Sequence, residues 1–309
     1  MVSIEYLAGF LDGEGPLSLA RRHRRRCSPE FSIRIAVYNS DVEVLKEVKR
    51  TFGGTLSSVA SRKPAWKPSH ALIWTNAAAA GILSRVTPYL RVKARRATVL
   101  LEFNRHVRDC QRRRDSAGRL LPLSSRDLKI LGTFFILLKR LNARGPDASR
   151  HQRDRPVRRA RPARLSARYL AGFVDAEGCL MILRSKRPSG SGTEYRARIS
   201  VSNTDRAVLA DLQMNYGGIL TNQPTQNARW RHAFQLVWTD GMVEPILLLM
   251  LPYLEVKRRQ ADLMMTFLRH KKCTRQGREG RYFAPLPDKI IAYREDLHRR
   301  IQTLNARGV

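Results

Sequence analysis

The chain has 309 residues, of which 43% are hydrophobic, and it carries a formal net charge of +32 with a pI of about 11.3. This composition allows a buried core. The strong positive charge predicts a polyanionic partner, for which nucleic acid is the leading candidate. A generic basic protein, such as a ribosomal one, is the alternative. No apolar run approaches the roughly 20 residues that a membrane-spanning helix needs, so no membrane partner is expected.

The cysteines and the N-terminal sequence bear on the compartment. None of the four cysteines, at positions 27, 110, 179 and 273, lies in a CxxC pair, so a zinc site is not expected. The first structural unit begins almost at the N-terminus, which leaves no room for a signal or transit peptide. We therefore expect a reduced, intracellular protein, in a bacterial or archaeal cytoplasm or in a chloroplast or mitochondrion.

The predicted elements begin with a helix over residues 3–13, followed by a strand in which Phe31, Ile33, Ile35 and Val37 alternate with more polar side chains. Asp41 is typical of a helix start, and the glycine pair at 53–54 is typical of its end. The remaining elements are a hairpin and three helices, expected at Leu56–Ser61, Ala71–Thr75, 77–86, 94–108 and 125–142.

The same order of elements returns at an offset of 163 to 164 residues. The nonapeptide LAGFLDGEG at Leu7–Gly15 returns as LAGFVDAEG at Leu170–Gly178, with seven of nine positions identical. Shorter repeats run along the rest of the chain, among them Trp74-Thr75 with Trp238-Thr239, Val92-Lys93 with Val256-Lys257, and Leu141–Gly145 with Leu304–Gly308. A repeat of this length predicts a tandem domain duplication, with the two copies packed about a pseudo-two-fold axis.

The predicted domains are an N-terminal repeat at 1–145, a linker at 146–168 and a C-terminal repeat at 169–309. The linker is rich in Pro and Arg and has almost no apolar residues, so it is expected to be exposed. It could serve as a plain tether or follow a phosphate backbone, and the sequence leaves both readings open. A basic run at Arg21–Arg26 falls at the first hairpin turn, where the second copy has Arg184 and Lys186.

The repeated nonapeptide carries the candidate chemistry. Its small residues, Ala8, Gly9 and Gly13 in the first copy, allow close approach of two helices. If the two helices pair in parallel, Glu14 and Glu177 meet at their C-terminal ends, where the helix dipole and the like charges are both unfavourable. Divalent cations offset such charge, and oxygen-only ligands favour Mg²⁺. A carboxylate–Mg²⁺ cluster under a basic surface predicts phosphodiester hydrolysis.

Two alternatives remain for the acidic residues of this motif. Glu14 and Glu177 could instead cap a loop or form surface pairs. Asp12 and Asp175 precede them by two residues and face another way, so we interpret them as structural groups that bond to backbone near the pseudo-dyad.

The two nonapeptides resemble the signature helices of the LAGLIDADG homing endonuclease family, in its single-chain form with two motifs. The resemblance covers both copies. It implies an α+β fold with an αββαββα order in each half and a saddle-shaped antiparallel sheet that lies in the DNA major groove. It also implies that Glu14 and Glu177 bind the catalytic metal, with the backbone carbonyls of Gly13 and Ala176 as further ligands. Both acidic residues are Glu where the family consensus has Asp.

The resemblance also implies a basic residue after the last strand, close to the scissile phosphates. Lys93 and Lys257 match it and are the candidates for stabilising the pentavalent phosphate or organising the attacking water. Gln260 matches a further polar position of the family, where the first copy has Arg96. The two active sites are therefore not expected to be chemically equal.

The sequence as a whole predicts a monomeric, site-specific DNA endonuclease that makes a double-strand break with Mg²⁺, or another divalent cation such as Mn²⁺, at an asymmetric target in double-stranded DNA. The predicted DNA contacts are Arg34, Arg198, Arg22, Arg24, Arg184, Lys186 and Gln235. The alternatives are a maturase of the same fold, whose partner is intron RNA, and a catalytically silent DNA-binding protein. An intein nuclease is disfavoured, because no splicing Cys or Ser begins the chain and no His-Asn ends it.

Overall fold

The computed structural model describes most of the chain and divides it into two compact units. The first is built mainly from Met1–Ala60 and Pro68–Arg161, and the second mainly from Pro162–Gln223 and Ala233–Val309. The described residues are 1–24, 27–60, 68–110, 115–118, 121–143, 164–186, 192–224, 232–274, 278–279, 282–283 and 286–306. Within them, no helix is long and apolar enough to cross a membrane.

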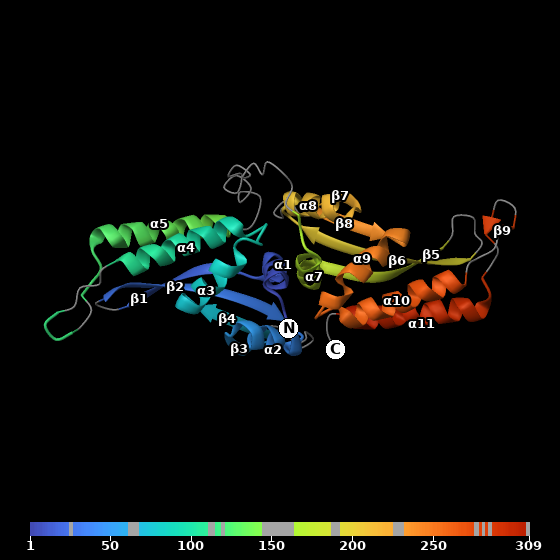
Figure 1. Cartoon of the computed structure of the whole chain (residues 1–309), viewed down its shortest axis with the longest axis horizontal. Helices are drawn as coiled ribbons and strands as arrows, with labels where there is room; N and C mark the ends of the chain where they lie inside the picture. The colour runs from blue at the N-terminus through green and yellow to red at the C-terminus, as the bar shows by residue number, and fades with distance from the viewer. Residues whose placement is uncertain are drawn as a thin grey trace. The chain divides into compact units, whose positions relative to one another are not determined.

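The first unit has the predicted order of a helix, two strands, a helix, two strands and further helices (Figure 1). Its strands form one antiparallel sheet in the order β1-β2-β4-β3. Helices α4 and α5 lie side by side and pack along β1. The elements are α1 (Ile4–Glu14), β1 (Leu17–Arg24), β2 (Cys27–Asn39), α2 (Val42–Phe52), β3 (Thr55–Val59), β4 (Ser69–Thr75), α3 (Asn76–Val86), α4 (Ala94–Asp109) and α5 (Ser125–Leu141).

The second unit repeats this order, and its sheet has the matching strand order β5-β6-β8-β7. Helices α10 and α11 pack along β5, as α4 and α5 do along β1 (Figure 1). Three short helices, η1, α9 and η2, stand where the first unit has α3. The elements are α7 (Ala167–Glu177), β5 (Gly178–Lys186), β6 (Thr193–Asn203), α8 (Arg206–Tyr216), β7 (Ile219–Gln223), β8 (Ala233–Thr239), η1 (Asp240–Met242), α9 (Val243–Met250), η2 (Leu251–Tyr253), α10 (Arg258–Cys273), β9 (Arg278–Glu279), β10 (Tyr282–Phe283) and α11 (Asp288–Asn305).

The αββαββα order predicted for each half is therefore confirmed, with helix bounds within about two residues of the predicted ones. The small β9–β10 hairpin was not predicted from the sequence. Ser61, at the end of the first strand of the predicted second hairpin, lies outside the described residues, as do Arg25 and Arg26 of the basic run and residues 146–163 of the predicted linker.

The predicted linker ends earlier than the sequence suggested, because the second unit begins before residue 169. The side chain of Ser166 accepts a hydrogen bond from the backbone N–H of Tyr169, so α7 begins at Ala167. Leu165 is buried, its N–H donates to the side chain of Asn215, and its carbonyl accepts from the hydroxyl of Tyr216. Residues 165–168 thus belong to the packed second unit.

The repeated Asn and Asp residues at 39 and 41, and again at 203 and 205, start the second helix of each unit. The side chain of Asn39 accepts the N–H of Asp41 at 2.8 Å, and Asp41 caps α2 by accepting the N–H of Glu43 at 3.0 Å. The equivalent bonds in the second unit are both 2.9 Å. In each unit, the Asn forms a turn and the Asp is the N-cap of the helix, as the sequence predicts for Asp41.

The glycine pairs end the same helices against a buried tryptophan. Gly54 and Gly218 have φ of +103° and +100°, a backbone conformation that residues other than glycine rarely adopt. A Cβ at either position would lie 2.9 Å from the indole Nε1 of Trp74 or Trp238. Each indole N–H donates to the last carbonyl of the helix, at 3.1 Å in the first unit and 3.0 Å in the second. The glycine is thus needed both for its backbone conformation and for the close approach of the ring.

Alternation along the strands gives each sheet one apolar face and one mixed polar face. In β2, Ile33, Ile35 and Val37 are buried with the leucines of β1, while Arg34 on the other face is exposed. Arg34 pairs across the sheet with Ser18 of β1 and with Thr75 of β4. The second sheet has the same register, with Arg198 opposite Thr239. The apolar face supplies the core, and the polar face is the one available for a ligand.

Candidate functional site

The two motif carboxylates occupy the same place in their units, at the last residue of α1 and of α7. Glu14 is exposed and Glu177 is half-buried. The glycine that follows each one turns back tightly on its helix, and the N–H of Gly15 donates to the carbonyl of Leu11 at 2.9 Å. A Cβ on Gly15 would lie 2.8 Å from the Cα of Leu11, and one on Gly178 would lie 2.5 Å from the carbonyl of Val174. The final glycine of the motif therefore lets the chain enter the first strand directly from the helix.

Asp12 is buried, with 1% of its surface exposed, and it holds a second segment of the chain against this helix end. Its carboxylate accepts the backbone N–H of Arg91 at 2.6 Å and that of Lys93 at 2.8 Å. Hydrogen bonds to an ionised carboxylate are roughly twice as strong as neutral ones. Asp12 therefore fixes the start of α4 beside the end of α1.

Asp175 does the same in the second unit, where it is 2% exposed. It accepts the N–H of Glu255 at 2.8 Å, that of Val256 at 3.1 Å and that of Lys257 at 2.9 Å. The prediction that both aspartates bond to backbone is confirmed. These backbone N–H groups lie in the same unit as their aspartate, in the segment that carries the predicted catalytic lysine.

The side chain of Lys93 points at the C-terminal end of α1. Its ammonium donates to the carbonyls of Leu11 at 2.5 Å, Asp12 at 2.9 Å and Gly13 at 2.9 Å. A cation is favoured at a helix C-terminus, because the last carbonyls have no partners within the helix and carry the negative end of the dipole. Lys93 and Glu14 are thus brought to one helix end, and the carbonyl that the sequence assigns to a metal, that of Gly13, accepts from the ammonium.

Lys257 also points at the end of its own motif helix, where its ammonium donates to the carbonyl of Asp175. The two lysines therefore occupy equivalent positions, and the expected chemical difference between the two active sites stays a prediction. The expected meeting of Glu14 with Glu177 concerns two different units and stays a prediction.

The donor set at each helix end fits a hard divalent cation. It consists of a glutamate carboxylate and main-chain carbonyls, and the motif contributes no imidazole or thiol. The Lys93 ammonium, held by three carbonyl oxygens, shows that this helix end binds positive charge. The carboxylates and carbonyls could hold Mg²⁺ or Mn²⁺ there.

The predicted DNA contacts of the first unit lie on the polar face of its sheet. Arg22 shares this face with Arg34, and it pairs across β1 and β2 with Glu30. Both arginines are exposed. The backbone of Arg24 follows an irregularity in β1 and pairs with Cys27, while its side chain lies outside the described residues.

In the second unit, Arg198 and Gln235 form a connected polar group on the same face. The guanidinium of Arg198 donates to the side-chain carbonyl of Gln235 at 2.7 Å, and the Gln235 amide donates to the hydroxyl of Ser202 at 3.2 Å. The exposed Arg196 also lies on this face and pairs with Glu194 at 3.1 Å. Arg196 was not among the DNA contacts predicted from the sequence, although the strand alternation places it on this face.

Arg184 and Lys186 lie on the opposite side of β5. They alternate with Met181 and Leu183, so they share the side of Ile182, which packs against the helices. The guanidinium of Arg184 pairs with Glu295 of α11 at 3.3 Å. Both residues are exposed, but the structure does not bring them together with Arg198, and their DNA contact stays a prediction.

Gln260 and its counterpart Arg96 share one structural role. The amide of Gln260 donates to the carbonyl of Leu304 at 3.4 Å, and the guanidinium of Arg96 donates to that of Leu141 at 2.8 and 3.1 Å. Each ties the start of a long helix to the end of the last helix. The proposed active-site role of Gln260 is left untested by these contacts.

Comparison with known proteins gives matches at two levels. Residues 170–240 match the sequence model of the LAGLIDADG endonuclease family. No curated protein sequence matched the chain. The fold is similar to solved structures over nearly the full length of both chains.

Three of these structures illustrate the likeness. I-SmaMI bound to cleaved DNA has a TM-score of 0.68 at 14% identity, over 98% of this chain and 96% of that one. I-SmaMI bound to uncleaved DNA in the presence of calcium ions gives 0.67 at 13% identity, over 98% of both chains. I-AabMI, a LAGLIDADG meganuclease bound to uncleaved DNA, gives 0.65 at 15% identity, over 96% and 98%. Residues 170–240 therefore match the LAGLIDADG endonuclease family, and the chain has, over nearly its whole length, the fold of the solved LAGLIDADG homing endonucleases.

Proposed function

We propose that the protein is a site-specific endonuclease that makes a double-strand break in DNA by hydrolysing phosphodiester bonds with a divalent cation. The observation that carries the proposal is the duplicated helix end, where a motif glutamate, a buried aspartate clamp and a lysine are held together in each unit. Structures of this fold bound to cleaved and uncleaved DNA support the substrate class.

The proposed roles follow from the chemistry of the groups. Glu14 and Glu177, with the carbonyls of Gly13 and Ala176, hold the cation. Mg²⁺ or Mn²⁺ would supply Lewis-acid stabilisation of the phosphate and a water of lowered pKa. Lys93 and Lys257 carry positive charge that can move from the helix carbonyls to the phosphate oxygens when a cation takes over those carbonyls.

DNA binding is assigned to the polar faces of the two sheets and to the net charge of +32. Arg22 and Arg34 in the first unit, and Arg198 with Gln235 in the second, carry the donors and acceptors that read base edges in a major groove. Arg24, Arg184 and Lys186, near the ends of the hairpin strands, are assigned to the phosphate backbone. Such phosphate contacts would fix the position of the protein on the duplex without reading its sequence.

The test is cleavage of the cognate site by Glu14→Gln and Glu177→Gln. Each substitution keeps the size of the side chain but removes the charge that holds the cation, so each should abolish double-strand cleavage while leaving DNA binding in place. Glu5→Gln is the matched control, because Glu5 lies in the first turn of the same helix as Glu14, at the other end. Full activity in either motif variant would remove the metal assignment.

Binding, cleavage and splicing measurements separate the endonuclease from the two alternative functions. A catalytically silent DNA-binding protein would bind the site without cutting it in Mg²⁺ or Mn²⁺. A maturase would promote splicing of its intron RNA, and that activity would persist in Glu14→Gln. Removal of the divalent cation with EDTA should stop cleavage, and addition of Mg²⁺ should restore it. This pair of measurements tests the cofactor directly.

A further inference from the structure

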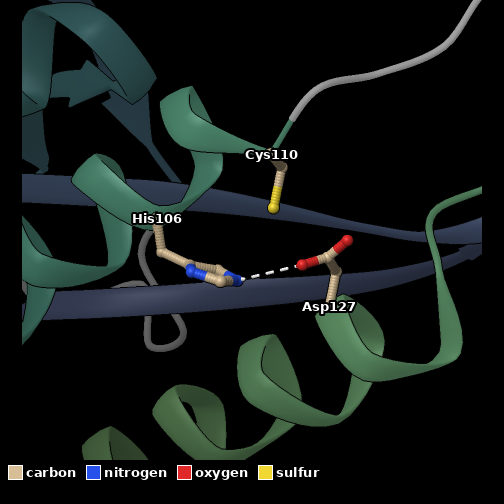
Figure 2. Close-up of side chains that lie close together, drawn as sticks. All are labelled: His106, Cys110 and Asp127. Carbon is tan, nitrogen blue, oxygen red and sulfur yellow. Dashed lines mark ion pairs between the residues drawn. The ribbon is translucent and has the colours of Figure 1, made fainter.

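A second group of potential metal ligands lies in the first unit, apart from the motif carboxylates. His106, Cys110 and Asp127 point toward one another from α4 and α5 (Figure 2), and one potential ligand atom from each lies within 4.8 Å of the other two. Lys93 occupies the N-cap position of α4, and Cys110 occupies its C-cap position. The 16 residues of α4 span about 24 Å at 1.5 Å per residue, which separates this group from the Lys93 end.

The local sequence positions the three side chains. His106 and Cys110 are four residues apart, so they share one face at the end of α4. Asp127 lies in the first turn of α5, where the Ser124 side chain accepts its N–H at 3.1 Å and donates to its Oδ2 at 2.6 Å. The carboxylate is thereby held in place, with Oδ1 directed to the His106 ring at 3.5 Å.

The imidazole is held in a defined orientation as well. Its ring packs against that of Phe134 with centroids 6.4 Å apart. Its Nε2 atom is buried, and it lies 3.5 Å from Oδ1 of Asp127 without making a hydrogen bond. A buried ring nitrogen that faces a carboxylate oxygen at this distance is placed to share a metal ion with it.

Cys110 also borders a small cavity of about 20 Å³, whose other lining residues are apolar. The sulfur thus has an apolar wall on one side and two potential co-ligands on the other.

We propose that His106, Cys110 and Asp127 bind a thiophilic divalent cation, foremost Zn²⁺, that fastens the end of α4 to the start of α5. Tetrahedral Zn²⁺ with Zn–N and Zn–O bonds of about 2.0–2.2 Å places those two ligand atoms roughly 3.4 Å apart, close to the 3.5 Å observed. An imidazole, a thiolate and a carboxylate suit Zn²⁺ better than Mg²⁺, which prefers oxygen alone. Binding displaces the thiol proton to solvent, and water completes the fourth position.

The second unit lacks the equivalent arrangement among its described residues, although it carries His270 and Cys273 at the matching positions. The His270 ring contacts that of Tyr293 in a tilted arrangement, with ring centroids 4.5 Å apart, and Cys273 is exposed. The duplication has therefore kept the histidine and cysteine but changed their surroundings, which makes Cys273 a natural control for Cys110.

The experiment is titration of the full-length reduced protein with Co²⁺, followed by displacement with Zn²⁺. A Cys–Co²⁺ bond gives a charge-transfer absorption in the near ultraviolet, which the oxygen ligands of Glu14 and Glu177 cannot produce. Wild-type protein and Cys273→Ser should show the band at one equivalent, and Cys110→Ser should lose it. Glu14→Gln should keep it, so the result does not depend on the proposed nuclease function.

A second measurement covers variants that change stability. Zn²⁺ should raise the Tm of the wild type and of Cys273→Ser but not that of Cys110→Ser, because only a cation that binds the folded state stabilises it. His106→Gln and Asp127→Asn should weaken Zn²⁺ binding by more than the roughly 10–100-fold that loss of an outer partner costs. No band in the wild type, or a band that survives in Cys110→Ser, would overturn the site.

Discussion

Lys93 binds Asp12 through both its backbone N–H and its side-chain ammonium. The carboxylate of Asp12 accepts the backbone N–H of Lys93 at 2.8 Å, and the Lys93 ammonium donates back to the main-chain carbonyl of Asp12 at 2.9 Å. The aspartate of the motif therefore positions the lysine whose charge the proposed chemistry needs. The motif therefore contains a positioning residue, Asp12, beside the proposed metal ligand, Glu14.

Removing this clamp should cost stability. Asp12→Asn and Asp175→Asn each replace a charged acceptor of several N–H groups by a neutral amide, so we expect each to lower the free energy of unfolding by about 2–4 kcal/mol. Urea denaturation checks the value. Asp262→Asn, in an exposed pair with Arg258, is the control and should change it by no more than about 0.5 kcal/mol. A clamp variant as mild as the control would contradict the role assigned to the buried aspartates.

The glycines that face the tryptophans should not tolerate a side chain. Gly54→Ala and Gly218→Ala combine a positive φ with a Cβ 2.9 Å from an indole nitrogen, and we expect a loss of about 1–3 kcal/mol for each. Gly81→Ala is the control, because Gly81 lies inside α3 with nothing within 4 Å of the added Cβ, and alanine there should stabilise by about 0.5–1 kcal/mol. Thermal unfolding monitored by circular dichroism gives both signs, and stabilisation by Gly54→Ala would refute the packing argument.

His270 should make stability depend on pH. Burial, and secondarily the nearby Arg294, lower the pKa of His270 below its ordinary value of 6.5. The unfolded chain therefore binds the proton more readily, so the contribution of His270 is complete above pH 6.5 and is lost as the pH falls toward the folded-state pKa.

The comparison that isolates this effect is His270→Phe, which keeps an aromatic ring in contact with Tyr293. Its unfolding free energy should fall less than that of the wild type between about pH 7 and pH 5. Identical profiles for wild type and His270→Phe would show that another group is responsible.

Binding to DNA should weaken steeply with salt. With many phosphate contacts, the affinity should fall roughly 10³–10⁵-fold between 50 and 200 mM salt, because each neutralised phosphate releases a counterion. Filter binding or fluorescence anisotropy over this range measures the slope. A flat profile would remove nucleic acid as the main partner.

The protein should act as a monomer on an asymmetric target. The polar faces of the two sheets carry different residues, with Arg34 and Tyr38 in one where Arg198 and Ser202 stand in the other, so the two units should prefer different base sequences. Sedimentation of the DNA complex, together with selection of cleaved sites from a random library, tests both parts. Two proteins per site, or a palindromic preferred target, would contradict the prediction.

The order of the elements could be predicted because each of its signals is local. Asp41 and Asp205 cap helices through bonds to residues two positions away, and the alternation from Phe31 to Val37 requires only that one face of a strand be buried. The duplication strengthened these predictions, since each element was seen twice. The position of Glu14 at the end of a helix followed from the same reasoning.

The rest depended on contacts between residues far apart in the chain. The three carbonyls that receive Lys93 lie 80 to 82 residues before it, and nothing in its flanking sequence indicates them. Arg184 occupies a strand position whose side is decided by register, so its pairing with Glu295 of α11 was not predictable from the basic run. The absence of a CxxC pair argued against zinc, whereas the fold brings Asp127 to Cys110 across a helix junction.

The repeated Leu-Asn-Ala-Arg-Gly segment bears on how such a chain could arise. Asn142 donates to the carbonyl of Leu17, and Asn305 donates to that of Leu180, each at 2.8 Å and across 125 residues. The end of each unit is thus bonded to the beginning of its own sheet, so the entry and exit of the chain lie close together. A domain with neighbouring ends can be joined to a second copy by a connection of almost any length without disturbing either one. A gene duplication could therefore fuse two such copies without distorting either fold, and each copy was then free to diverge on the polar face of its sheet.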